Sequence, residues 1–218
     1  MKVFRTSEVL AGGHYEIGDV VSFSLEDGEE VEAVAVKEEF DAQNNAYMVF
    51  MFVDCLKKEY PMNERDTNEG GYEESYLRQK LNTEILERFP AAMRLSLIPF
   101  DNGDLLRIPT EYEIFGENEY GEQEPDCVEQ FEYTKKRRGR IALAGLNGGL
   151  QYYWLQNKRV RSATSFAIVT TTVLRPTAPL LILVVFVRFI VSVIIGNPAT
   201  IYGGDKLWKR RCFYGIDG

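Results

Sequence analysis

The most informative stretch of this 218-residue chain is Tyr72-Glu-Glu-Ser75-Tyr-Leu77-Arg78-Gln-Lys-Leu81-Asn82. Apolar residues recur here at spacings of four, and the same spacing continues to Phe89. This pattern is typical of an amphipathic helix with one buried stripe. Because Gly70-Gly71 precedes the stretch and Pro90 follows it, the sequence predicts a helix over residues 72–89.

The segment before this helix is rich in strand patterns. Residues 19–25 and 30–36 alternate apolar and polar side chains, and Glu26-Asp27-Gly28 between them is typical of a turn. The two runs therefore predict a β-hairpin. Residues 47–56 are apolar on both faces, which predicts a central strand that is covered on both sides.

The segment after the helix predicts shorter elements. We expect a strand at residues 105–108 and a short helix that opens at Pro109-Thr110-Glu111 and ends near Phe115. Residues 116–140 are rich in glycine and glutamate and end in a basic run, which predicts a long surface insertion. Two further strands are expected, at residues 151–155 and 165–169. Short strands outnumber helices, so the chain belongs to the α+β class.

Charge is divided unevenly along the chain. The formal net charge is −8, but residues 1–133 carry 11 Lys and Arg against 31 Asp and Glu, whereas residues 134–218 carry 14 against 2. The acidic segment, residues 1–133, would repel the phosphate backbone of a nucleic acid, so we expect no nucleic-acid partner. The run Lys135-Lys-Arg-Arg-Gly-Arg140 could meet phosphate or an acidic lipid surface, although a solvated loop or an intramolecular charge match is the commoner explanation.

The three cysteines bear on the cellular compartment. Cys55, Cys127 and Cys212 lie far apart and show no C-x-x-C spacing, so neither a disulfide framework nor a zinc site is indicated. The N-terminus has no apolar stretch of the length of a signal peptide. These observations predict a cytoplasmic protein.

The sequence contains none of the common catalytic templates. It lacks G-x-S-x-G, G-x-x-x-x-G-K-[ST], H-E-x-x-H and G-x-G-x-x-G, and its only histidine, His14, has no evident orienting partner. Residues 101–104 carry closely spaced oxygen ligands but not the further ligands of a calcium loop, which favours a plain turn. We therefore expect no catalytic residue, no metal and no cofactor.

Three separated elements of the chain match the motifs of a single family. They are the stretch from Tyr72 to Asn82, then Ile108-Pro109-Thr110-Glu111-Tyr112-Glu113, and then Trp154-Leu155-Gln156-Asn157. Together they resemble a bacterial and phage domain family of unknown function, over residues 20–170. The resemblance implies a C-type-lectin-like fold of the formylglycine-generating (sulfatase-modifying) kind, so residues 1–170 would form one domain.

The resemblance implies a non-catalytic binding or structural module of a kind that phages also encode, with a ligand or protein partner that the sequence does not identify. The alternative within the family is an oxidase, which needs a reactive cysteine pair. Cys55 in an apolar strand and Cys127 in an acidic loop are poor candidates for such a pair, because both settings raise the pKa of a thiol. Enzyme activity is therefore the weaker hypothesis.

The resemblance also singles out two sets of residues. The family motif corresponds to Ser75, Leu77, Arg78, Leu81, Asn82, Pro109 and Thr110. Leucines at these positions suit a core, whereas Arg78 and Asn82 can hydrogen-bond to neighbouring loops. A ligand surface is expected around Tyr153, Trp154, Gln156 and Asn157, with a core strand as the alternative interpretation of the aromatic residues.

The tail from residue 171 to residue 218 departs from the rest of the chain. Residues 180–195 are sixteen almost wholly apolar residues, a little short of the roughly 20 that cross a bilayer. Taken literally, they predict a C-terminal membrane anchor, and Arg188 at the centre costs about 2.5–3.5 kcal/mol on insertion. The membrane is thus the alternative location, and it holds only if this segment is genuine.

A shifted reading frame is the other interpretation of the tail. The resemblance stops at Thr171, where the family continues with Asp/Asn-Gly and later with Gly-Val-Arg-Pro. New codons can be built from the last base of one residue's codon and the first two bases of the next. Thr171/Thr172 then gives Asn, Asp, Tyr or His, Thr172/Val173 allows Gly, and residues 184–188 allow Gly-Val-Arg-Pro in order. Residues 171–218 then represent the frame-shifted end of the same domain.

We predict that the native gene encodes the residues after about position 170 in this shifted frame, which replaces the apolar run by a polar, turn-rich strand. Sequencing the gene and measuring the intact mass of protein from its native host check the prediction. A single continuous frame that yields residues 180–195 in cells would contradict it, and the unshifted protein is then expected to partition into membranes.

Overall fold

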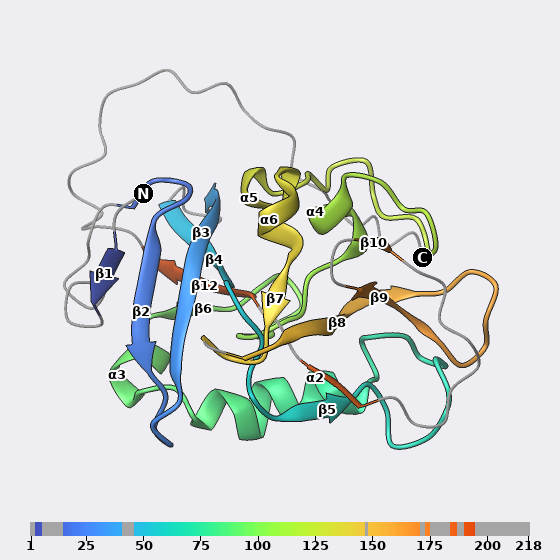
Figure 1. Ribbon diagram of the computed structural model, residues 1–218, viewed down its shortest axis with the longest axis horizontal. Coiled ribbons are helices and arrows are strands. Elements are labelled where there is room, and N and C mark those ends of the chain that lie inside the picture. Colours follow the sequence, from blue (N-terminus) through green and yellow to red (C-terminus); the bar gives the residue numbers. More distant parts are fainter. Residues whose placement is uncertain are drawn as a thin grey trace.

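The computed structural model of the protein describes residues 3–5, 15–40, 46–146, 148–170, 173–174, 184–186 and 190–194. Within these residues the chain forms two small sheets and several short helices (Figure 1). Most neighbouring strands are antiparallel. The α+β class that the sequence predicts is confirmed.

The first sheet joins strands from the start, the middle and the end of the described chain. Its order is β1-β2-β3-β4-β12-β6. Only β1 and β2 run parallel to each other in it. The strand bounds are Val3–Arg5 (β1), Val20–Ser24 (β2), Glu30–Phe40 (β3), Ala46–Phe52 (β4), Ile190–Ile194 (β12) and Leu97–Ile98 (β6).

Two expectations for this sheet are confirmed. β2 and β3 form an antiparallel hairpin, and Gly28 in its turn has a φ of +82°, which glycine adopts without strain. β4 lies between β3 and β12 and is buried on both faces. Phe50 packs in one hydrophobic cluster, and the next residue, Met51, packs in a second cluster on the opposite face.

The second sheet is built around β8. Its order is β10-β9-β8-β11-β5, and β7 also pairs with β8. The strand bounds are Val173–Leu174 (β10), Phe166–Thr170 (β9), Leu150–Lys158 (β8), Val184–Phe186 (β11), Glu59–Pro61 (β5) and Ala142–Leu143 (β7). β8 and β9 pair antiparallel, which confirms the two strands expected near the end of the domain.

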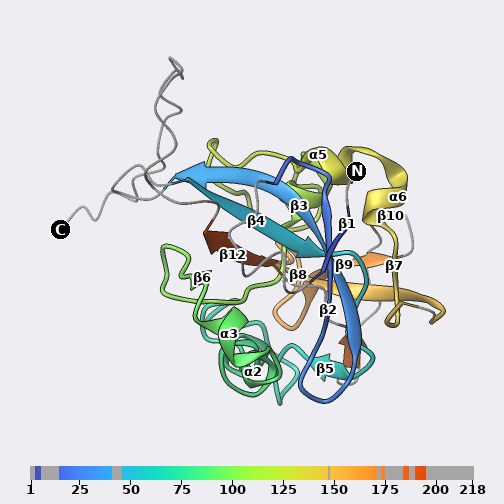
Figure 2. The same cartoon turned by 90° about the vertical axis from the view of Figure 1, so that its left-hand side faces the viewer.

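The helices lie at two opposite ends of the molecule. The first group covers one end and consists of α2 (Tyr76–Lys80), the π-helical turn η1 (Leu81–Ile85) and α3 (Ala91–Arg94). The second group consists of α4 (Glu111–Phe115), α5 (Glu132–Lys135) and α6 (Arg137–Arg140). In both Figure 1 and Figure 2 the first group lies at the bottom and the second at the top.

The motif helix, formed by α2 and η1, begins later than the sequence predicts. It starts after Ser75 instead of at Tyr72, because the Ser75 hydroxyl accepts a hydrogen bond from the backbone N–H of Arg78 (3.1 Å) and thereby caps the helix. The preceding glycines, Gly70 and Gly71, both have positive φ and form turns instead. The short helix α4 is confirmed, with Thr110 as its N-cap.

The π-helical turn keeps the apolar stripe of the motif helix aligned. Leu77, Leu81, Ile85 and Phe89 are all 0% exposed. In an α-helix a spacing of four residues rotates the side chain by about 40° at each step, so three steps would carry Phe89 about 120° away from Leu77. The wider turn at η1 rotates less per residue and returns the stripe to the core.

The strand expected at residues 105–108 is wrong. No strand is formed there; Arg107 makes only an isolated bridge, and most of the backbone groups are held by side chains instead. The amide oxygen of Asn82 accepts hydrogen bonds from the N–H of Leu105 and of Leu106, and the Tyr72 hydroxyl accepts one from the N–H of Ile108. The apolar side chains of this segment explain the misleading pattern, because Leu106 and Ile108 are core residues.

Residues 116–140, which the sequence predicts as a surface insertion, contain both exposed and buried parts. The segment contains α5 and α6, and Gly121 forms a backbone bridge with Arg159. Phe131 is 2% exposed and Thr134 is 0% exposed, so the second half of the segment contributes to the core. Glycine and glutamate content does not reveal such isolated anchors.

The described parts of residues 180–195 are strands in the frame as printed. β11 lies between β5 and β8, and β12 lies between β4 and β6. Among the described residues, no helix combines the length and the apolar character that a membrane span needs. Apart from β10, β11 and β12, residues 171–218 lie outside the described residues, as do His14 and Cys212.

Trp154 on β8 is a core residue by its burial. It is 7% exposed, packs edge-on against Phe166, and its indole Nε1–H donates to the carbonyl of Tyr60 (3.1 Å). Tyr152 lies on the same face of the strand but is 47% exposed. The two residues form a matched pair for testing the core interpretation.

We predict that Trp154→Ala lowers the free energy of unfolding by about 3–5 kcal/mol, because it removes a large buried ring and leaves a buried carbonyl without its donor. Tyr152→Ala should cost about 1 kcal/mol or less. Urea denaturation of both variants measures the difference. An alanine variant of Trp154 that unfolds at the wild-type midpoint would favour the ligand-platform interpretation instead.

Candidate functional site

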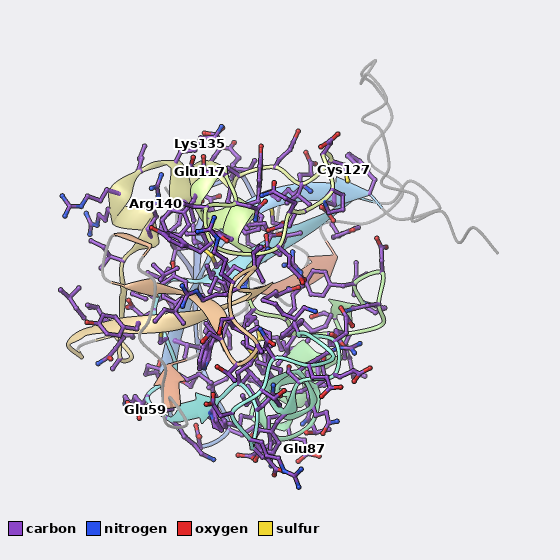
Figure 3. All side chains as sticks on the ribbon, turned by 90° about the vertical axis from the view of Figure 1, so that its right-hand side faces the viewer. Glu59, Glu87, Glu117, Cys127, Lys135 and Arg140 are labelled. Atoms are coloured by element: carbon purple, nitrogen blue, oxygen red, sulfur yellow. The ribbon has the colours of Figure 1, made fainter. Side chains whose placement is uncertain are left out.

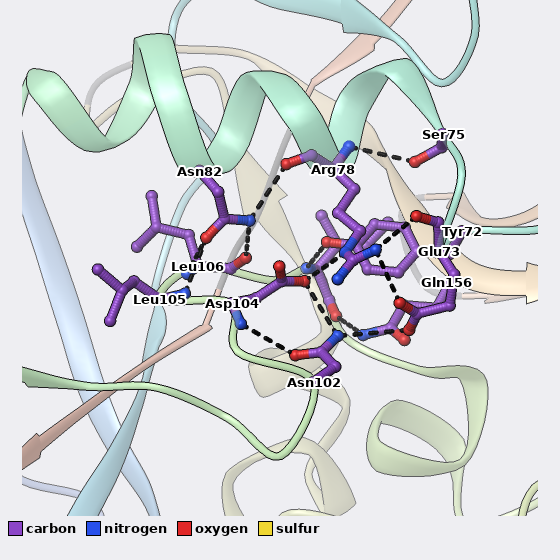
Figure 4. Close-up of polar contacts among 11 residues, drawn as sticks. Tyr72, Glu73, Ser75, Arg78, Asn82, Asn102, Asp104, Leu105, Leu106 and Gln156 are labelled. Carbon is purple, nitrogen blue, oxygen red and sulfur yellow. Dashed lines mark hydrogen bonds and ion pairs between the residues drawn. The ribbon is translucent and has the colours of Figure 1, made fainter.

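Polar residues of the family motifs, among them Arg78, Asn82 and Gln156, lie together with Asn102 and Asp104 beside the motif helix (Figure 4). The first of their contacts join the helix to the turn at residues 101–104. The Arg78 guanidinium donates to the carboxylate of Asp104 (Nε–Oδ2 2.7 Å) and to the carbonyl of Glu73 (2.5 Å). Because the hydrogen bond to Asp104 stabilises the cation, the pKa of Arg78 is raised.

Asn102 extends this ion pair to the surface. Its side-chain nitrogen donates to Asp104 (3.0 Å) and to the exposed carboxylate of Glu73 (3.3 Å). Its side-chain oxygen accepts from the backbone N–H of Asp104 (3.1 Å). The segment 101–104 is therefore the plain turn that the sequence favours, and its carboxylate at Asp104 neutralises Arg78.

Asn82 joins the motif helix to the next segment of chain. Its side-chain oxygen accepts from the N–H of Leu105 (2.8 Å) and of Leu106 (3.0 Å). Its side-chain nitrogen donates to the carbonyls of Arg78 (3.1 Å) and Leu106 (2.9 Å). One amide thus makes four hydrogen bonds to the backbone, which is its full capacity.

Tyr72 and Gln156 meet at Ile108. The Tyr72 hydroxyl lies 3.4 Å from the N–H of Ile108, and the side-chain nitrogen of Gln156 donates to its carbonyl (2.6 Å). Burial raises the pKa of the Tyr72 hydroxyl, so the group stays protonated and neutral. Ile108 thus connects Gln156 on β8 to Tyr72, which lies just before the motif helix.

Pro109 and Thr110 complete the connection to α4. The carbonyl of Pro109 accepts from the backbone N–H of Gln156 (3.1 Å). Thr110 and Glu113 form a reciprocal capping box, with the Thr110 hydroxyl accepting from the N–H of Glu113 (3.2 Å). The Arg107 guanidinium also donates two hydrogen bonds to the Glu113 carboxylate (2.6 and 2.8 Å). Burial acts to lower the pKa of Arg107, but the negative charge of Glu113 outweighs burial, so the pKa is raised.

Asn157 and Glu111 form a second clamp, at the far end of β8. The Asn157 side-chain oxygen accepts from the N–H of Glu111 (2.7 Å), and its nitrogen donates to the carbonyl of Glu122 and to the carboxylate of Glu124 (both 3.0 Å). Glu111 is 0% exposed. Its carboxylate accepts from three successive backbone N–H groups, at residues 119, 120 and 121 (2.9, 3.0 and 2.6 Å).

The residues expected to form a ligand surface are mostly buried. Tyr153 is 0% exposed and donates its hydroxyl to the carbonyl of Arg140 (3.0 Å), and Asn157 is 8% exposed. Gln156 is half-buried. Together with Trp154, these side chains hold neighbouring segments on β8, so within the described residues they present little surface to a ligand.

The described residues also show how potential metal ligands and two of the cysteines are placed. They contain no group of three or more His, Cys, Asp and Glu side chains that could hold a metal ion. Cys55 is a buried thiol, in keeping with its place in an apolar run. Cys127 is disulfide-bonded, which the wide spacing of the cysteines does not predict.

Comparisons with known proteins give no match. No protein-family model matches the chain, and neither a curated protein nor a solved structure matches it.

We predict that Asn82→Asp destabilises the protein by about 2–4 kcal/mol, because the new carboxylate oxygen would face the carbonyls of Arg78 and Leu106 without a proton to share. Asn82→Ala should cost a similar amount through the unpaired N–H groups of residues 105 and 106. Thr83→Ala, at the neighbouring exposed position, is the control. Thermal unfolding ranks the three variants, and an Asn82→Asp variant as stable as the control would contradict the proposed role of the amide.

Proposed function

We propose that the protein is a non-catalytic binding or structural module with a C-type-lectin-like fold. One observation carries the proposal: single buried side chains hold long irregular loops in place. Glu111 holds residues 119–121 in this way, and Asn82 holds residues 105–106. Catalysis needs polar groups that are aimed at a substrate, whereas these groups are aimed at the backbone.

Asn68 is a third such side chain. It is 8% exposed, and its side-chain nitrogen donates to the carbonyls of Ser162 (2.7 Å) and Ser165 (3.0 Å). Its backbone N–H donates to the carbonyl of Ala163 (3.1 Å). The loop between β5 and α2 is therefore tied to the loop between β8 and β9.

A third loop joins the same group. The N–H of Glu122 donates to the carbonyl of Lys158 (2.9 Å), and the N–H of Val160 donates to the carbonyl of Tyr120 (3.1 Å). Residues 62–75, 118–124 and 159–165 thus form one continuous surface, here named the loop face. It lies on the right-hand side of Figure 1 and faces the viewer in Figure 3.

A prearranged loop face suits binding for an energetic reason. Ordering a flexible loop on association costs conformational entropy, and loops that are already held by buried hydrogen bonds avoid much of that cost. Loops on a rigid scaffold are also the usual location of binding residues. Val160 on this face is 66% exposed and so offers an apolar contact to a ligand.

We predict that binding to an immobilised array of glycans and peptides depends on the clamps beneath the loop face. Glu111→Gln and Asn68→Ala should each weaken binding at least tenfold, because they release residues 119–121 and 162–165. Glu87→Gln, an exposed position on the motif-helix end, should leave binding unchanged. Circular dichroism must show that each variant remains folded.

Two outcomes would contradict the proposal. Array binding that survives the release of both loops would exclude the loop face as the binding surface. Conversion of a cysteine-containing peptide by the copper-loaded protein, read by mass spectrometry, would favour the oxidase alternative, since copper chemistry there requires thiolate ligands.

A further inference from the structure

The end of the molecule opposite the motif helix carries a compact basic surface, made by α5, α6 and the residue between them. Lys135, Lys136, Arg137 and Arg138 are all exposed there. They occupy four consecutive positions, and no acidic residue follows them in the described chain up to residue 170. This group is named the basic turn, and Figure 3 shows Lys135 at its edge.

Buried residues next to the basic turn fix its backbone to the rest of the protein. Thr134 is 0% exposed, and its hydroxyl donates to the carbonyl of Glu113 (2.7 Å) and lies 2.9 Å from that of Phe131. Gly139 fits directly against the backbone of Tyr133, where an added Cβ would lie 1.9 Å from the carbonyl oxygen. Any other residue at position 139 would therefore displace the turn.

Arg140 belongs to this anchor and not to the exposed charge. Its Nε donates to the carbonyl of Thr134 (2.7 Å), and its guanidinium carbon lies 5.1 Å from the centre of the Phe115 ring. The Tyr153 hydroxyl donates to the carbonyl of Arg140 (3.0 Å). The backbone of the basic turn is thus fixed on both sides, while its four cations point away from the core.

The charges of the basic turn are only partly matched within the protein. Lys135 pairs with Glu132. No ion pair with another described residue reaches Lys136 or Arg138. Because the backbone of the basic turn is already fixed, an anion that binds there does not have to order the backbone, and guanidinium groups suit carboxylates especially well.

The surroundings limit the size of the anion. Glu117, Glu129 and Glu132 are exposed on the segments that lead into the basic turn, and residues 1–133 carry 11 cationic against 31 acidic side chains. Screening confines electrostatic attraction to about 8 Å at physiological salt. A long polyanion or a membrane surface would extend beyond the basic turn and meet these carboxylates, whereas a short segment would not.

We propose that the basic turn is a docking site for a short acidic peptide segment of a partner protein. The segment would place three or four Asp or Glu side chains against Lys136, Arg137 and Arg138. This site is separate from the loop face, so it does not depend on the function proposed above. None of the four exposed residues is aromatic, so the basic turn lacks the stacking platform on which proteins bind single-stranded nucleic acid.

The experiment measures binding of a fluorescent hexaglutamate peptide to the full chain by anisotropy. We expect Lys136→Ser with Arg138→Ser to weaken binding at least tenfold. The matched control, Lys57→Ser with Lys58→Ser, removes the same charge from exposed positions outside both surfaces and should change binding less than twofold. Raising the salt to about 1 M, where the screening length falls to about 3 Å, should abolish binding.

Hydrogen exchange of the wild-type protein provides a readout that needs no variant. Adding the peptide should slow exchange at residues 135–140 and leave residues 62–75 unchanged. No binding, equal loss in the control variant, or protection only at the loop face would overturn the proposal. Tighter binding of a 20-base-pair duplex or of phosphatidylserine vesicles than of the peptide would also overturn it, in favour of a polyanion or a lipid surface.

Discussion

A buried backbone polar group must have a hydrogen-bond partner, and this constraint governs the part of the protein that lies outside its sheets. Residues 99–131 contain no strand and only one helix of five residues. Some of their backbone groups bond to each other in turns, and others are satisfied by a few buried amides and carboxylates, of which Asn82 and Glu111 hold five backbone N–H groups. These loops are therefore not held by the regular backbone hydrogen bonds of a β-sheet. Their shapes depend on individual side chains.

The core depends on a second constraint, which is the need to cover the first sheet on both faces. Alternate residues of β3 and β4 belong to two separate hydrophobic clusters. The motif helix covers one face with an unbroken apolar stripe, and the π-helical turn keeps that stripe in line. Tyr153 and Leu155 of β8 belong to the cluster on the other face. The second sheet therefore contributes to the cores on both sides of the first.

The sequence predicts secondary structure correctly wherever the spacing of apolar residues repeats over enough positions to be recognised. The hairpin of β2 and β3, the two-sided strand β4 and the motif helix all follow from repeated apolar spacing. The segment at residues 105–108 was misassigned because buried side chains do not reveal whether the backbone pairs with a strand or with Asn82. The clamp role of Glu111 carries no sequence signal either, because a buried carboxylate looks like any other acidic residue of a loop.

For the candidate site, too, the sequence predicts some contacts but does not distinguish buried residues from exposed ones. Arg78 and Asn82 were expected to hydrogen-bond to neighbouring loops, and they do so. For Tyr153 and Trp154 the sequence leaves a ligand surface and a core strand as alternatives, and their burial agrees with the core strand; Asn157, which the sequence places at the ligand surface, is also buried. Aromatic and amide residues on a strand can form either a ligand surface or part of the core. Only the packing of the second sheet and of residues 108–124 distinguishes these two roles.

The position of β12 between β4 and β6 has a consequence for the order of events during synthesis. The ribosome releases β4 roughly 140 residues before β12, and domains assemble as the chain emerges. Until then the apolar edge of β4 has no neighbour on that side, and an unpaired edge is a template for pairing with other chains. In the frame as printed, the growing polypeptide therefore passes through a long interval in which one edge of the half-built sheet is unpaired.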